Sequence, residues 1–148
     1  MNVNLLDTSA LIALLDPSHV FHSLVARWFR ENSDESWATC PLTQNGFIRI
    51  VSHPSYPQHI GVAQAIATLQ TTTASSAHCF WPDEITLTDT DIFNDSHLLG
   101  SGQITDTYLL GLAVSHSSRL VTLDRRIDVA TVRGASPSSL LILDPAKR

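Results

Sequence analysis

The sequence predicts an α/β protein, a three-layer α/β/α sandwich with a mainly parallel central sheet. Short apolar segments typical of buried strands alternate with segments whose apolar residues recur at helical spacing. The chain has 148 residues, of which 43% are hydrophobic, and it contains no internal repeat. That length is sufficient to bury a substantial core. We therefore expect a single domain over residues 1–148.

The first predicted element is a strand that runs directly into a helix over residues 3–16. Asp7 lies at the junction, and Thr8 and Ser9 follow it at positions where side chains cap a helix. In open α/β sheets, ligands and catalytic groups gather beyond the carboxyl ends of the strands. Asp7 is therefore either a helix cap or part of a functional site. Other acids at the same edge of the sheet would favour the second interpretation.

A second helix is predicted over residues 18–32, with Ser18 as its cap. Val20, Leu24 and Trp28 follow one another at four-residue spacing, which places them on one face of a helix. We expect that face to be part of the core.

The middle of the chain continues the alternation of extended and helical segments. Proline opens one of the helices, and a His-Pro pair ends it. The expected elements are a strand over residues 37–40, a helix over 41–53, a helix from 62 that fades over 71–76, and extended segments over 79–81 and 85–88.

The last third of the chain has the clearest pattern. Residues 103–117 form a strongly apolar helical repeat, and residues 119–123 form a buried-looking strand that ends on Asp124. Residues 140–143 predict one more strand. Strands that alternate with helices in this way are typical of a parallel sheet covered on both faces.

The charge of the chain restricts its function. A net charge of -5 and a pI of about 5.7 argue against a protein that coats nucleic acid, because such proteins carry a strongly basic surface. A metal-dependent nuclease is compatible with this charge, because its site concentrates carboxylates that are neutralised only when cations bind.

The apolar runs are too short to cross a bilayer, which needs about 20 residues. No basic residue precedes Arg27, so the positive start of a secretory signal is missing. Cys40 and Cys79 lie in apolar surroundings without metal-ligand spacing, and we expect buried thiols. These observations predict a cytoplasmic protein without a membrane partner.

Three aspartates occupy comparable places in the predicted fold. Asp7 and Asp124 each follow a strand, and Asp106 lies in the first turn of the helix that leads to the second of these strands. If the two strands are neighbours in a parallel sheet, the three side chains can point into one crevice.

Such a cluster needs a counter-charge. Two like charges about 4 Å apart repel each other by about 4 kcal/mol at an effective dielectric constant of about 20. A site built from carboxylates alone, without cysteine or clustered histidine, favours Mg²⁺ or Mn²⁺ over zinc. We therefore expect Asp7, Asp106 and Asp124 to bind a divalent metal.

Four segments in this order resemble a known family. They are Leu-Leu-Asp-Thr-Ser-Ala-Leu-Ile at residues 5–12, Thr-Gln-Asn-Gly-Phe-Ile-Arg at 43–49, Thr-Asp-Thr-Tyr-Leu-Leu at 105–110, and Val-Thr-Leu-Asp-Arg at 121–125. With these segments the chain resembles a PIN-domain ribonuclease, in particular a VapC-type toxin of a bacterial type II toxin–antitoxin system. The resemblance covers essentially the whole chain, and its order and spacing are more specific than any single segment.

The resemblance implies a Mg²⁺- or Mn²⁺-dependent endoribonuclease that hydrolyses RNA, often a structured RNA such as tRNA. It also implies a homodimer and a cognate antitoxin that silences the enzyme. Carried over by position, Asp7, Asp106 and Asp124 would be the catalytic, metal-binding acids, and Thr8 or Ser9 would support the site.

The chain departs from the family pattern at one position. The family usually has a glutamate where this sequence has Gln44, followed by Asn45. An amide can orient a water molecule by hydrogen bonding, but it supplies no negative charge and is no ordinary general base. The alternative hypothesis is therefore a PIN-like module that binds RNA or an antitoxin with weak or no catalysis.

The chemistry expected of the site is hydrolysis of a phosphodiester, with bound metal polarising the phosphate and activating water. Arg49, Arg125 and Arg126 are candidates for contact with RNA phosphates, although each is equally compatible with an ordinary surface role.

Two other classes also place acids at strand ends. A receiver-like signalling module fits poorly, because such domains have a lysine in the pocket and the only lysine here is Lys147. A haloacid-dehalogenase-like phosphatase is disfavoured, because that family has a second aspartate where this chain has Ser9.

Overall fold

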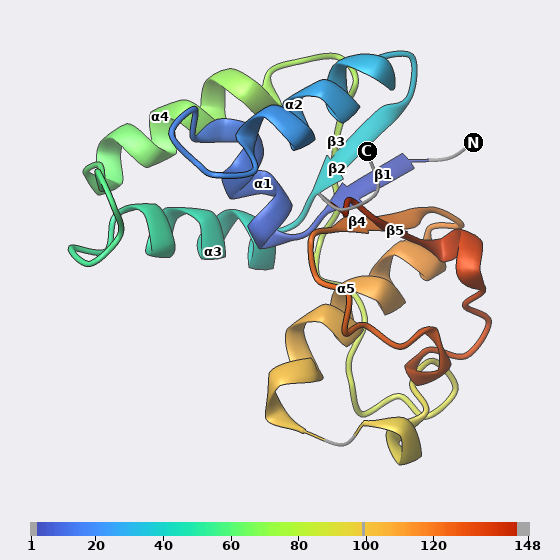
Figure 1. Ribbon diagram of the computed structural model, residues 1–148. Helices are drawn as coiled ribbons and strands as arrows, with labels where there is room; N and C mark the ends of the chain where they lie inside the picture. The colour runs from blue at the N-terminus through green and yellow to red at the C-terminus, as the bar shows by residue number, and fades with distance from the viewer. Residues whose placement is uncertain (1–2, 99, 145–148) are drawn as a thin grey trace.

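The computed structural model describes residues 3–98 and 100–144. Its centre is a sheet of five parallel strands in the order β3-β2-β1-β4-β5. Figure 1 shows helices α1 to α4 on one side of this sheet and α5 on the other. The strands are β1 (Val3–Leu6), β2 (Ser36–Thr39), β3 (His78–Phe80), β4 (Arg119–Thr122) and β5 (Leu140–Ile142). The helices are α1 (Thr8–Leu15), α2 (His22–Glu31), α3 (Pro41–Val51), α4 (Val62–Thr73) and α5 (Ile104–Ser115).

The three-layer arrangement follows from the apolar side chains of the strands. Successive strand residues point to opposite faces, so in β1 the side chain of Leu5 packs beside α5, whereas Leu6 packs beside α1 and α3. Both faces of the sheet are therefore apolar and need a helical layer, as is typical of parallel sheets. The predicted α/β/α sandwich is confirmed.

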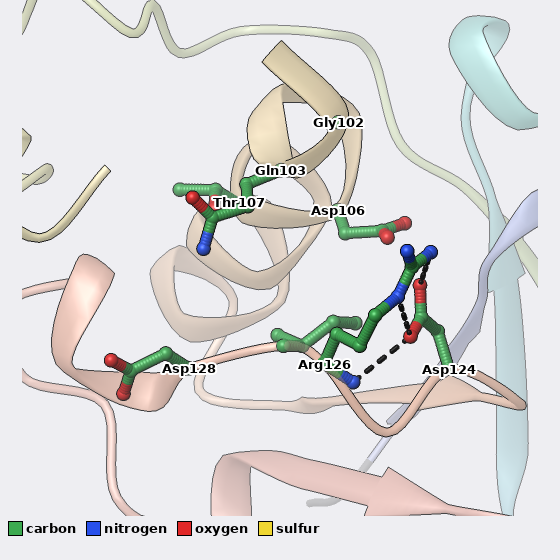
Figure 2. A pocket seen from close by; sticks show the side chains of 8 residues that line it. Gly102, Gln103, Asp106, Thr107, Asp124, Arg126 and Asp128 are labelled. Carbon is green, nitrogen blue, oxygen red and sulfur yellow. Dashed lines mark hydrogen bonds and ion pairs between the residues drawn. The ribbon is translucent and has the colours of Figure 1, made fainter. Parts of the chain in front are cut away.

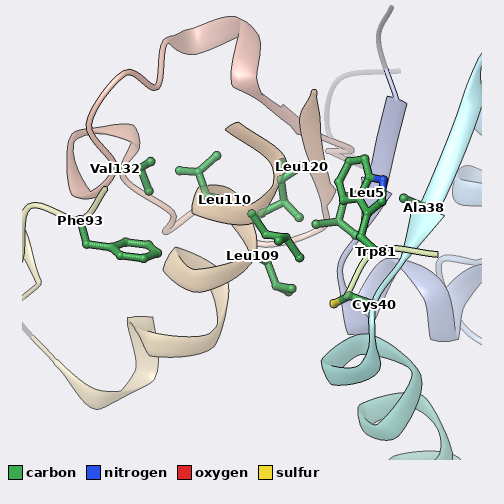
Figure 3. Packing of buried hydrophobic residues seen from close by; sticks show 11 residues of the cluster. Leu5, Ala38, Cys40, Trp81, Phe93, Leu109, Leu110, Leu120 and Val132 are labelled. Carbon is green, nitrogen blue, oxygen red and sulfur yellow. The ribbon is translucent and has the colours of Figure 1, made fainter. Parts of the chain in front are cut away.

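The core on the α5 side is centred on Leu5, Leu109 and Leu120, which are completely buried (Figure 3). Trp81 and Phe93 close it from the irregular segment that follows β3. Burying a leucine side chain stabilises a fold by about 1.5–3 kcal/mol. This cluster therefore fixes α5 against the strands that carry the site.

The prediction for the second helix was wrong at its start. Helix α2 begins at His22, and the preceding residues form turns. Asp16 accepts a hydrogen bond from the amide of Ser18, and the ring of His19 accepts one from the amide of Phe21, so local side chains take up donors near the expected helix start. Val20, expected in the core, is 81% exposed.

Other predictions need smaller corrections. Residues 85–88, expected to be extended, form no strand and include a turn. Helix α4 covers the predicted region, but its core contacts come from Ala65 and Leu69, while Ile66 is exposed. Both cysteines are free thiols, as expected, with Cys40 buried and Cys79 half-buried. No helix in the described ranges has the length and apolarity that crossing a bilayer requires.

A close contact between α1 and α3 positions the start of α1. Gly46 of α3 is buried against Thr8, the first residue of α1. A Cβ atom on residue 46 would lie 2.8 Å from the Thr8 hydroxyl oxygen and 2.9 Å from its methyl carbon. Real Cβ atoms do not approach this closely, so only glycine allows the two helices to meet here.

We expect Gly46→Ala to lower the free energy of unfolding by about 1–3 kcal/mol, because the added methyl group must displace Thr8. Chemical denaturation at equilibrium measures this change. Gly102→Ala is the control, because a Cβ there meets nothing within 4 Å, and its effect should stay within about 0.5 kcal/mol. Equal effects of the two substitutions would contradict the proposed close contact.

Candidate active site

The three predicted acids lie together at the carboxyl edge of the sheet. Asp7 follows β1, Asp124 comes two residues after β4, and these strands are neighbours. Asp106 reaches the same edge from the first turn of α5. The three side chains border one hollow of about 260 Å³, which we call the acid hollow. Its lining is Asp7, Thr8, Ser9, Ile12, Ile50, Thr105, Asp106, Leu109 and Asp124.

Asp7 is the most deeply placed of the three acids, with only 3% of its surface exposed. One carboxylate oxygen accepts hydrogen bonds from the amide of Ala10 at 2.8 Å and from the hydroxyl of Ser9 at 2.9 Å. Asp7 therefore caps α1 and also faces the acid hollow. Burial raises its pKa above the ordinary aspartate value, and these hydrogen bonds oppose the rise.

Thr122 is a site residue that the sequence analysis missed. Thr122 is the last residue of β4. Its hydroxyl donates a hydrogen bond to the second carboxylate oxygen of Asp7 and accepts one from the amide of Asp124 at 3.0 Å. The side chain thus joins two of the acids across neighbouring strands. The available signal in the sequence was a threonine inside an apolar predicted strand, two residues before a site aspartate.

Asp106 is half-buried near the two other acids. Burial is the main cause that raises the pKa of Asp106 to about 6, and the negative charges of Asp7 and Asp124 raise it further. Its proximity to Asp124 allows the two carboxyls to share a hydrogen bond when Asp106 is protonated. A bound cation would offset the part of this rise that comes from the two neighbouring acids.

Asp124 already has a cationic neighbour. Its two oxygens accept hydrogen bonds of 3.0 Å from Nε and Nη2 of Arg126, and the Arg126 amide adds one of 2.9 Å. Figure 2 shows this pair, with the guanidinium on the side of Asp124 that faces Asp106. Hydrogen bonding to Arg126 is the main cause that lowers the pKa of Asp124.

The donor set fits a hard divalent cation. All three acids offer oxygen, which Mg²⁺ and Mn²⁺ prefer. Burial is the main cause of the raised pKa values of Asp7 and Asp106, and the negative charges of neighbouring acids add to it. In their observed rotamers, however, the three acids are not grouped as ligands of one metal ion. Among the described residues, no three His, Cys, Asp or Glu side chains are grouped closely enough to hold a metal ion. Asp124 is turned to Arg126 instead.

Gln44 lies in the first turn of α3, but it does not line the acid hollow. Its amide nitrogen donates to the hydroxyl oxygen of Thr39 at 2.9 Å, and that oxygen is 2.8 Å from Nε2 of His78. Burial lowers the pKa of His78 and so favours the neutral ring. The side chain of Gln44 is therefore held at the end of β2.

The remaining predicted residues divide into two groups. Thr8 and Ser9 line the acid hollow, and Ser9 also bonds to Asp7. Arg49 is exposed in the last turn of α3 and does not line the hollow. Arg125 does not line the hollow either, and its side chain forms an ion pair of 3.3 Å with Asp144.

We expect the raised pKa of Asp106 to make the metal-free protein less stable as pH rises from about 4 to about 6. Over this range the unfolded chain releases a proton that the folded protein retains. In EDTA, Asp106→Asn should therefore melt about 2–4 °C above the parent at neutral pH, with no gain at about pH 4. That range allows for solvent screening at a half-exposed site.

Thermal unfolding across this pH range measures the difference between the two proteins. Asp34→Asn, which removes an exposed carboxyl far from the hollow in sequence, controls for the loss of one charge. If Asp106→Asn raised the melting temperature equally at every pH, the raised pKa of Asp106 would not be the cause of the difference.

Comparison with known proteins identifies the family of the chain. The sequence pattern of the PIN domain matches residues 5–132, a range that contains Asp7, Asp106 and Asp124. The chain is 42% identical to ribonuclease VapC44 of Mycobacterium tuberculosis over 139 residues, which is 94% of this chain and 98% of that protein.

Two further relatives come from Mycobacterium tuberculosis H37Rv. The chain is 39% identical to ribonuclease VapC38 over 141 residues, or 94% of this chain and 98% of the relative. It is 40% identical to ribonuclease VapC39 over 121 residues, or 81% of this chain and 87% of the relative. The family pattern and these long alignments together show that the chain belongs to the PIN-domain family, within its VapC group.

Proposed function

We propose that this protein is a divalent-metal-dependent endoribonuclease toxin that hydrolyses RNA phosphodiester bonds. The observation that carries the proposal is the acid hollow, where Asp7, Asp106 and Asp124 converge at the carboxyl edge of a parallel sheet. The names of the relatives support the reaction class, because each is a ribonuclease.

In this proposal Asp7, Asp106 and Asp124 hold Mg²⁺ or Mn²⁺. The metal, when bound, polarises the phosphate, activates water and stabilises the leaving oxygen. Asp7 contributes a fixed carboxylate, since Ser9, Ala10 and Thr122 hold both of its oxygens. Asp106 and Asp124 lie closer to solvent and adjust around the ion.

Gln44 has a positioning role in the proposal. Its amide is fixed by Thr39 and offers a carbonyl oxygen as hydrogen-bond acceptor for water beside the hollow. Arg49 and Arg125 are exposed, and we assign them to RNA phosphates at the margin of the site.

The proposed partners follow from membership of the VapC group. They are an RNA substrate such as tRNA, a cognate antitoxin protein and a second copy of the chain. We place the toxin in the cytoplasm, where these RNAs lie, and we propose that residues 1–148 act as one PIN-like domain.

One observation favours a second candidate function, a PIN-like module that binds RNA or an antitoxin with little catalysis. Gln44 is neutral and is turned toward Thr39, so the hollow receives no charge from this position. The two candidates differ in divalent-dependent turnover, which only the ribonuclease shows.

We expect Asp7→Asn to lower divalent-dependent RNA cleavage by at least about 100-fold, because the site loses its fixed negative charge. Cleavage of structured RNA is measured with Mg²⁺ or Mn²⁺, and with EDTA as the metal-free control. Asparagine also caps helices well, so the fold should persist, and thermal unfolding checks this. Asp106→Asn, at a less buried position, should give a similar loss. Cleavage by both variants at the parent rate would refute the ribonuclease assignment.

We expect Gln44→Glu to increase the cleavage rate severalfold and to tighten Mn²⁺ binding, because a carboxylate adds negative charge beside the hollow. The fold should tolerate the change, since the Thr39 hydroxyl can donate to glutamate as well as accept from glutamine. Asn45→Asp adds the same charge on the exposed neighbouring position and is the matched control. An equal response of both variants would mean that position 44 acts only through general electrostatics.

A further inference from the structure

Arg126 stands out among the basic residues of the described chain because it is paired with a site acid. Its side chain is 86% exposed, yet it approaches Asp124 with both a guanidinium fork and its own backbone amide. Its charge also lowers the pKa of Asp106. The guanidinium therefore acts on two of the three acids without entering the core.

The contact occupies the oxygens that a metal would use. Oδ1 of Asp124 accepts from the Arg126 amide and from Nε, while Oδ2 accepts from Nη2. A bidentate guanidinium and a directly bound divalent ion compete for the same carboxylate lone pairs. In the observed rotamers the acids accordingly form no ligand set within the described residues.

We propose that Arg126 is a built-in counter-cation of the acid cluster, which neutralises Asp124 in the metal-free protein and must release it when a divalent ion binds. This inference rests on the proposed function, because it assumes that Asp7, Asp106 and Asp124 are the metal-binding acids. It goes beyond that function by assigning a residue that opposes metal binding.

The structure leaves room for the release. Beside the acid hollow lies a second hollow of about 270 Å³, which Asp106, Asp124 and Arg126 all line (Figure 2). The guanidinium needs only side-chain rotation to leave Asp124, and its high exposure means that water solvates it after release. The hydrogen bond from the Arg126 amide to Oδ1 remains after this rotation, so the exchange concerns the two bonds that the guanidinium donates.

If Arg126 is such a counter-cation, removing its side chain should have opposite effects on thermal stability and on Mn²⁺ affinity. Without metal, Arg126→Ala should lower the melting temperature, because the acids lose their counter-charge. With metal, the same substitution should tighten Mn²⁺ binding by about 2- to 5-fold, the range expected for an exposed ion pair with good geometry. A residue that only supported the fold would weaken both properties.

Arg125→Ala is the matched control. It removes the same charge one position earlier, from a side chain that pairs with Asp144. Its general electrostatic effect on Mn²⁺ binding should be small, and Arg126→Lys should fall between the parent and Arg126→Ala because it keeps the charge and loses the fork.

The test is calorimetric titration of the full-length proteins with Mn²⁺ alone, together with thermal unfolding in EDTA. The expected result is tighter binding by Arg126→Ala than by both the parent and Arg125→Ala. Equal Mn²⁺ affinity in the parent and Arg126→Ala overturns this inference and leaves the proposed function intact. Absence of Mn²⁺ binding in the parent and in every variant overturns the metal site and the inference together.

Discussion

The buried carboxylate of Asp7 is the constraint on which the site depends. It ends β1, caps α1 and accepts a hydrogen bond from Thr122 of the neighbouring strand β4. A carboxylate is costly to bury unless its oxygens are hydrogen-bonded. One side chain therefore connects the end of β1, the start of α1 and the acid hollow with the neighbouring strand β4. The close contact of Gly46 with Thr8 holds the same junction from α3.

The electrostatics of the three acids differ because their surroundings differ. Burial raises the pKa of Asp7, burial together with two neighbouring acids raises that of Asp106, and Arg126 lowers that of Asp124. The cluster is thus only partly neutralised by the protein itself. A divalent cation has a higher charge density than the guanidinium and would neutralise such a site more completely. In the proposed mechanism, Arg126 sets how readily that ion enters.

The departure at position 44 is accommodated locally. Gln44, Thr39 and His78 form a chain of hydrogen bonds at the end of β2, and the ring of His78 also packs against Trp37 at a centroid distance of 4.6 Å. The amide is therefore well integrated even though it carries no charge. This chain links the site to the strand beside β1 and supports a positioning role for Gln44 in the proposed ribonuclease.

The sequence alone determined the sheet, the layers and the three acids, because apolar periodicity and the place of Asp7, Asp106 and Asp124 are local properties of the chain. It also determined the resemblance to VapC-type PIN domains, although the roles of the acids remain proposals. The start of α2 and the exposure of Val20 depended on turn hydrogen bonds that periodicity does not reveal. Three contacts became visible only in the folded protein: Thr122 with Asp7, Gln44 with Thr39, and Arg126 with Asp124. Side-chain direction is set by neighbours that are distant in sequence or by rotamer choice, and neither is encoded in residue spacing.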